Sequence, residues 1–100
     1  MDVNTHGRVF SALASHPRRQ IIAFLSQTAL STAELAGRFG ISAPAISRHL
    51  SVLQAAGLVS AERQGQRVLY RLNRDPLLEA LSRFASEMDA PLRRTPREAI

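Results

Sequence analysis

The chain has 100 residues, enough for one domain with a modest hydrophobic core, and no cysteine, which excludes a disulfide framework, a thiolate metal site and a thiol redox switch. Its 13 arginines, with no lysine, against eight acidic residues give a formal net charge of +5, which favours a polyanionic partner, nucleic acid before membrane. No apolar run approaches membrane-spanning length and the N-terminus does not resemble a signal peptide, so we expect a cytoplasmic protein that does not contact membranes.

Two short helices are expected at the beginning of the chain. The first covers residues 3–15, and the second opens near Pro17, because proline is favourable in a first helical turn. The apolar positions with helical spacing are Val9, Phe10, Leu13, Ile21, Ile22 and Leu25. Arg18 and Arg19 oppose the dipole at the start of the second helix, and we expect them in solvent.

Two further helices joined by a short turn follow. The first begins at a capping box formed by Ser31 and Glu34, and Gly40 ends it. The second begins at Ser42, whose hydroxyl can accept a hydrogen bond from a first-turn amide, and Gly57 ends it. This arrangement predicts a helix-turn-helix.

The second helix of this pair has one face suited to DNA. Its apolar stripe consists of Ile46, Leu50 and Leu53 and should face a core. The opposite face carries small and hydrogen-bonding side chains and one cation: Ala43, Pro44, Ser47, Arg48 and Ser51, with His49 on the flank. A helix that lies in a major groove needs such a face, although an ordinary solvated face is the alternative.

A change of period predicts a β-hairpin next. Residues 58–63 and 67–72 flank a connection formed by residues 64–66, and the second segment alternates as a strand with one buried face does. Residues 58–74 hold four arginines and one acid: Arg63, Arg67, Arg71, Arg74 and Glu62. A basic hairpin after a helix-turn-helix is typical of a wing that follows the DNA backbone, unless its charges only keep it soluble.

The last helix is expected over residues 75–88, with Asp75 as its N-cap and Pro76 in its first position. Its apolar stripe is too wide for one small domain to cover, so we expect it to pair with the same helix of a second chain, beside the first helix. The predicted dimer interface contains Val9, Phe10, Leu13, Leu77, Leu81, Phe84 and Met88. Residues 1–90 would form one domain and residues 91–100 a flexible tail.

Four segments, residues 12–19, 30–36, 42–50 and 53–59, resemble the ArsR/SmtB family of bacterial transcriptional repressors. The most specific part is Ser-Arg-His-Leu followed by Leu-x-x-Ala-Gly-Leu-Val. The resemblance implies a mainly α winged helix-turn-helix, with five helices and a two-stranded wing, that dimerises through its terminal helices and binds imperfect DNA palindromes. Carried onto this chain, the DNA-contacting residues are Ser42, Ala43, Ser47, Arg48, His49, Arg63, Gln64, Gln66 and Arg67.

The chain departs from the metal sensors of that family. One family site uses a Cys-x-Cys pair at the start of the first helix of the helix-turn-helix, where residues 32–34 hold no cysteine. A second uses Asp, His and Glu along the last helix, where Asp75 and Glu79 occur but no histidine follows. Two carboxylates alone make a poor transition-metal site. We therefore expect no metal ligand and no cofactor, as in the metal-free branch of the family.

The sequence gives little support to two other classes of function. For a hydrolase, Ser47 and His49 point about 200° apart on a helix and cannot form a nucleophile–base pair, and no phosphate loop or nucleophile elbow occurs. A winged helix used only for protein–protein contact would be favoured by an acidic helix or wing. The sequence predicts a non-enzymatic, DNA-binding repressor that acts as a homodimer on an inverted-repeat operator. The remaining alternatives are a winged helix module for protein–protein interaction and a regulator that responds to an unidentified small molecule.

Overall fold

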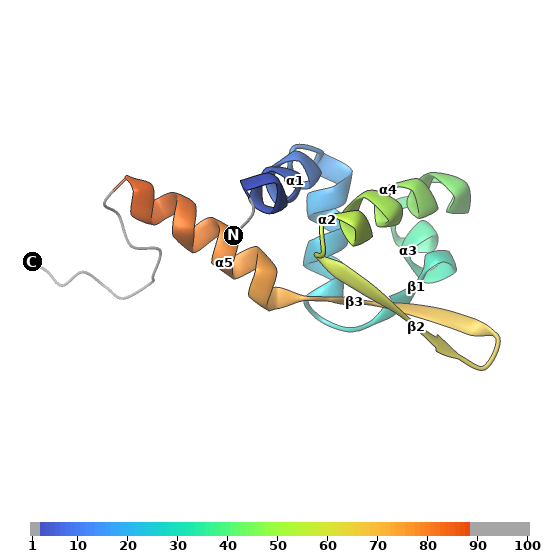
Figure 1. Ribbon diagram of the computed structural model, residues 1–100. Coiled ribbons are helices and arrows are strands. Elements are labelled where there is room, and N and C mark those ends of the chain that lie inside the picture. The colour runs from blue at the N-terminus through green and yellow to red at the C-terminus, as the bar shows by residue number, and fades with distance from the viewer. Residues whose placement is uncertain (1–2, 89–100) are drawn as a thin grey trace, which may run out of the picture.

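A computed structural model describes residues 3–88, which form five helices and three strands. In chain order they are α1 (Val3–Leu13), α2 (His16–Leu25), β1 (Leu30–Ser31), α3 (Thr32–Phe39), α4 (Ala43–Ala55), β2 (Val59–Gln64), β3 (Arg67–Leu72) and α5 (Arg74–Glu87). The β2–β3 hairpin and α5 extend from opposite ends of the helical body (Figure 1). The winged helix-turn-helix architecture is therefore as predicted, while the predicted tail, residues 91–100, lies outside the described residues.

The junction of α1 and α2 is held by the two arginines that we expected in solvent. Ser15 is extended and caps α2, accepting a hydrogen bond from the Arg18 amide at 3.4 Å, so α1 ends at Leu13 and not at residue 15. Arg18 Nε donates to the Ala12 carbonyl at 2.7 Å, and Arg19 Nη1 donates to the Leu13 carbonyl at 2.7 Å. Arg19 is exposed, as expected, whereas Arg18 is half-buried; both nevertheless bind α1, because its C-terminal carbonyls need donors and attract cations.

The caps of the helix-turn-helix are as predicted. Ser31 and Glu34 form both hydrogen bonds of the capping box, and Gly40 ends α3 with a φ of 70°. Ser42 Oγ accepts from the Ala45 amide at 3.2 Å at the start of α4. At the other end Gly57 has a φ of 79°, which glycine adopts without steric cost and which closes the last turn of α4.

The wing belongs to a three-stranded antiparallel sheet in the order β1-β3-β2. Strand β1 was not predicted, because two residues are too few to show a period; Leu30 pairs with Tyr70 and Ser31 with Leu69. Strand β2 also runs one residue further than predicted, since Gln64 pairs with Arg67. Only two residues then connect the strands, and Gly65 takes the positive φ, 63°, that such a short turn requires.

The core lies where α1, α2, α3 and α4 meet the base of the hairpin. Its largest fully buried side chains are Val9, Ile21, Leu35, Ile46, Leu50, Leu53 and Leu58. They include the entire predicted stripe of α4, so packing orients that helix with its polar face outward.

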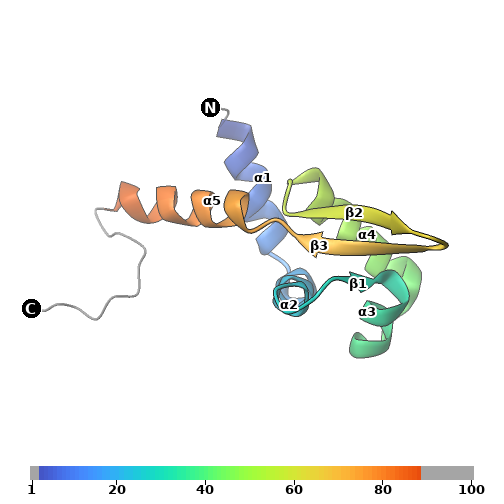
Figure 2. The same ribbon diagram turned by 90° about the horizontal axis from the view of Figure 1, so that it is seen from below.

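Helix α5 starts one residue earlier than predicted, and Asp75 is not its N-cap. Asn73 occupies that position, but its side chain makes no capping bond. Instead its Nδ2 donates to the Gly57 carbonyl at 3.1 Å and its Oδ1 accepts from Ser60 Oγ at 3.2 Å. The first residues of α5 are thereby attached to the end of α4 and the start of the wing. From there α5 runs past α1 and away from the sheet (Figure 2).

Candidate nucleic-acid interface

The exposed face of α4 carries the side chains that the sequence pointed to for DNA. Ser42, Ala43, Ser47 and Arg48 are exposed, and His49 is half-buried. The opposite side of the helix is fixed by Ile46, Leu50 and Leu53, of which none is more than 1% exposed. A helix held so firmly on one side presents a rigid polar ridge on the other, which is what a major-groove helix needs.

His49 lies at the edge of this ridge. Partial burial lowers the pKa of its imidazole, and the guanidinium groups of Arg18 and Arg48 lower it further by repulsion. The ring is therefore neutral at neutral pH, and a neutral imidazole has one donor and one acceptor nitrogen. Positive charge on this part of the ridge comes from Arg48 and not from His49.

The four wing residues carried over from the family pattern are all exposed at the tip of the hairpin: Arg63, Gln64, Gln66 and Arg67. Arg63 Nη1 donates to the Gly65 carbonyl at 3.4 Å, within the turn. Arg71, further along β3, pairs with Glu62 at 2.9 Å. Arg71 therefore offers less positive charge to a bound phosphate than Arg63 does, because its charge is partly neutralised by Glu62 within the hairpin.

Arg67 has an acidic neighbour that sequence reasoning missed. Its Nη2 lies 2.9 Å from Oε1 of Glu34, and both side chains are about half exposed. The same oxygen accepts the Ser31 amide at 2.8 Å as part of the capping box. The hydrogen bond from the Ser31 amide above all holds the pKa of Glu34 below its ordinary value; desolvation opposes this lowering, and the charge of Arg67 adds to it. No sequence signal reveals this pair, because its members belong to separate elements.

Helices α1 and α5 share an apolar surface. Phe10 and Phe84 meet edge to face with ring centroids 5.4 Å apart, and Leu13, Leu77 and Leu81 are half-buried. Large side chains nevertheless remain exposed along α5: Leu78 at 53%, Phe84 at 50% and Met88 at 58%. Val9 does not belong to this surface, since it is 1% exposed and packs in the core of its own chain. Its place in the predicted interface is therefore withdrawn.

Within residues 3–88 no three side chains among His, Asp and Glu come together as a metal site would require. Among the same residues, no helix combines the length and the apolar character needed to cross a bilayer.

The chain is similar in sequence to known bacterial regulatory proteins. Residues 15–61 match the model of the family described as bacterial regulatory protein, arsR family. Over 74 residues the chain is 35% identical to the transcriptional repressor SdpR of Bacillus subtilis, covering 74% of this chain and 82% of that protein. It is 39% identical over 66 residues to the HTH-type transcriptional repressor SmtB of Mycobacterium tuberculosis, covering 66% of this chain but only 49% of that longer protein.

Two solved structures show the same fold. An ArsR-like transcriptional regulator from Rhodococcus sp. RHA1 has a TM-score of 0.76 at 34% identity, covering 86% of this chain and 84% of that one. The homodimeric winged helix-turn-helix DNA-binding domain of a possible ArsR-family regulator from Mycobacterium bovis has a TM-score of 0.73 at 31% identity, covering 87% and 82% of the two chains. Both likenesses extend well beyond the helix-turn-helix.

Proposed function

Because this chain belongs to the arsR family of bacterial regulatory proteins, we propose that it is a repressor that binds an inverted-repeat operator as a homodimer, without a metal effector. It would act on double-stranded DNA in the cytoplasm and catalyse no reaction. The observation that carries this proposal is the polar ridge of α4, which is locked from behind by three buried residues and flanked by a basic hairpin.

Three side chains of the ridge and its edge have the donors and acceptors needed to recognise bases. Arg48 is exposed and can donate two hydrogen bonds to O6 and N7 of a guanine, the geometry for which a guanidinium is suited. Ser47 beside it can donate or accept, and the neutral ring of His49 can do either at its two nitrogens. Arg63 and the glutamines of the wing tip would then contact phosphates, which position the protein without reading sequence.

A homodimer is supported by the apolar surface of α1 and α5. Leu78, Phe84 and Met88 are half exposed or more in the single chain, and an apolar stripe of this length is unusual on a soluble monomer. The Mycobacterium bovis relative with this fold is a homodimer. Two-fold symmetry would place two recognition helices about one helical turn of DNA apart, which calls for an inverted repeat.

The absence of a metal effector is supported by the donor groups present. Thr32 and Ala33 stand where the thiolate sensors of the family carry cysteine, and α5 offers carboxylates without imidazole. Release from DNA would then depend on another signal, and an organic ligand is the second candidate. One pocket of the structure favours that candidate.

The proposed function is tested by gel shift on DNA taken from upstream of the protein's own gene. We expect a discrete complex that a scrambled duplex of equal length does not compete away, and affinity that falls steeply as salt rises. Arg48→Ala should reduce the preference for the upstream DNA. Equal affinity of the wild type for both duplexes would contradict the proposal.

A further inference from the structure

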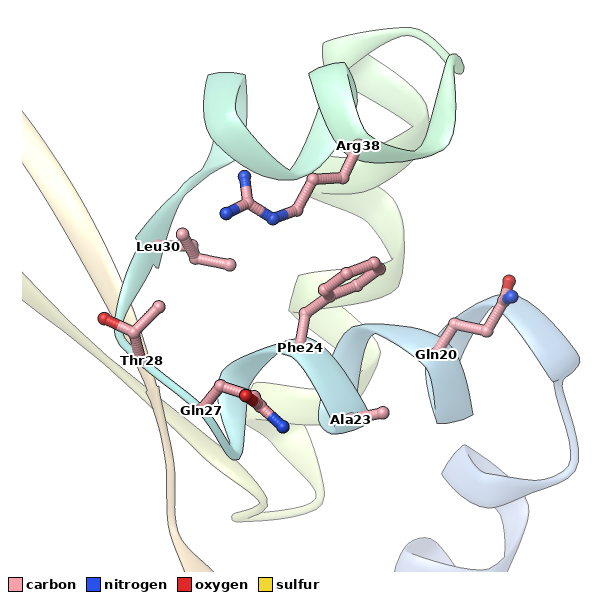
Figure 3. A pocket seen from close by; sticks show the side chains of 7 residues that line it. All are labelled: Gln20, Ala23, Phe24, Gln27, Thr28, Leu30 and Arg38. Atoms are coloured by element: carbon pink, nitrogen blue, oxygen red, sulfur yellow. The ribbon is translucent and has the colours of Figure 1, made fainter.

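A pocket of about 470 Å³ opens between α2 and α3 (Figure 3). Its lining comes from α2, from the loop that follows it, from β1 and from the last turn of α3. The lining residues are Gln20, Ala23, Phe24, Gln27, Thr28, Leu30 and Arg38. Sites for small organic molecules occupy roughly 300–1,000 Å³, so the space is sufficient for one.

One aromatic ring and one guanidinium dominate this pocket. The Arg38 guanidinium carbon lies 5.7 Å from the centroid of the Phe24 ring, and Figure 3 shows Arg38 entering the pocket from α3 while Phe24 enters it from α2. The Phe24 ring is itself held edge to face by Phe39, with centroids 5.3 Å apart. Stacking engages the flat face of a guanidinium and leaves the N–H donors along its edge free for a ligand.

The charge of the residues that line the pocket is of one sign, positive. Arg38 is the cation, and none of the seven lining residues is acidic. The neutral polar groups are the amides of Gln20 and Gln27 and the hydroxyl of Thr28, whereas Phe24, Leu30 and Ala23 supply apolar surface. A cationic ligand would meet repulsion here, and an inorganic anion would leave the apolar wall unused.

We propose that this pocket binds a small organic anion, in which a carboxylate contacts Arg38 and an aromatic or other flat apolar group packs against Phe24. The charge-assisted hydrogen bonds between guanidinium and carboxylate would supply specificity, and the apolar wall would supply burial. Such a ligand would touch α2 and α3 together, and α3 is the first helix of the helix-turn-helix. The site itself does not depend on the proposed DNA-binding function, because it is defined without DNA.

The test uses 4-fluorobenzoate as the probe and the full chain without DNA. Fluorine NMR of the probe should report saturable binding, with a Kd on the order of 1 mM for a molecule of this size. The neutral probe 4-fluorobenzyl alcohol has the same ring without the carboxylate, and we expect it to bind about tenfold more weakly or worse.

Two variants locate the binding. Arg38→Gln should weaken 4-fluorobenzoate about tenfold or more, whereas Arg83→Gln, which removes an exposed arginine of α5 outside the pocket, should not. Ala23→Phe places a ring in the pocket from an exposed helical position and should block the probe while the circular dichroism spectrum stays that of the wild type. No saturation at about tenfold the expected Kd, or equal binding by the wild type and Arg38→Gln, would overturn the proposal.

Discussion

Oxygen Oε1 of Glu34, in the first turn of α3, lies 2.9 Å from Nη2 of Arg67, at the start of β3. Because the same oxygen also accepts the Ser31 amide, a single carboxylate connects the start of the helix-turn-helix to the wing. Exposed ion pairs stabilise a fold by about 1 kcal/mol at most. The pair therefore matters less for stability than for the charge that Arg67 can offer to DNA.

We expect Arg67, which pairs with Glu34, to contribute less to DNA binding than Arg63, whose guanidinium contacts the Gly65 carbonyl. Arg63→Gln should reduce the slope of log K against log salt by about 0.9, and Arg67→Gln by less, since its phosphate contact is shared with Glu34. Glu34→Gln keeps a residue that can complete a capping box but removes the carboxylate charge. In the Glu34→Gln protein, Arg67→Gln should reduce the slope of log K against log salt by the full amount, about 0.9.

Glu62→Gln is the matched control for this cycle. It removes the same charge from the other ion pair of the wing, in which Glu62 contacts Arg71 and not Arg67. It should leave the effect of Arg67→Gln unchanged. Strict additivity of Glu34→Gln and Arg67→Gln would show that the pair does not modulate the wing.

Arg48→Ala tests base reading by the ridge of α4. If Arg48 contacts a guanine, its loss should cost about 1–3 kcal/mol on the operator and less on random DNA. The comparison is Arg83→Ala, another exposed arginine, which lies on α5. A loss of the same size on operator and random DNA would reassign Arg48 to a phosphate.

Metal ions should leave the complex with DNA unchanged. Zinc, cadmium or arsenite titrated to micromolar concentrations should not alter the operator affinity, because cysteine is absent from the chain and α5 has no imidazole. The measurement is a binding isotherm with and without a chelator. A tenfold weakening that the chelator reverses, about 1.4 kcal/mol of coupling, would reveal a metal site.

Phe84→Glu should dissociate the proposed homodimer. The side chain is 50% exposed in the single chain, so the monomer should lose little beyond the contact with Phe10, but a carboxylate buried between two copies would cost several kcal/mol. Sedimentation of the wild type should give twice the 11.0 kDa chain mass, and the variant should give the chain mass. Ser82→Glu adds the same charge to the same helix outside the apolar stripe and should remain dimeric. A monomeric wild type would contradict the proposed dimer.

The pKa of His49 predicts a loss of stability in mild acid. Burial and two arginines lower the pKa in the folded state below 6.5, so the unfolded chain binds more protons as pH falls through about 6.5. The free energy of unfolding should therefore decrease from that pH downward, until the lower folded-state pKa is passed. Urea unfolding between about pH 8 and about pH 5 measures it.

His49→Gln should flatten this part of the pH profile, and Arg48→Gln should reduce the loss by removing one source of repulsion. Arg48 is exposed, so its replacement leaves the core intact. A profile as steep in His49→Gln as in the wild type would assign the acid sensitivity to other groups.

The sequence alone determined the features that depend on near neighbours along the chain. Helix caps join residues three apart, as at Ser31 and Ser42, and the stripe of α4 repeats with the helical period. The alternation of side chains along β3 and the glycine in the turn before it are also local features, because they depend on the geometry of the strand and of its turn. Together with the family motifs, these local rules were sufficient for the winged helix-turn-helix and for the face of α4 offered as the recognition surface.

Only the tertiary structure decided the contacts between distant segments. Arg18 and Arg19 cap the helix before their own, Glu34 meets the wing, and Asn73 bonds the loop after α4 instead of capping α5. None of these contacts leaves a repeating pattern in the sequence. Whether two distant side chains meet depends on how whole helices and strands pack, and not on the spacing of residues along the chain. For the same reason, the burial of Val9 in the core and the pocket beside Phe24 and Arg38 could be known only from the tertiary structure.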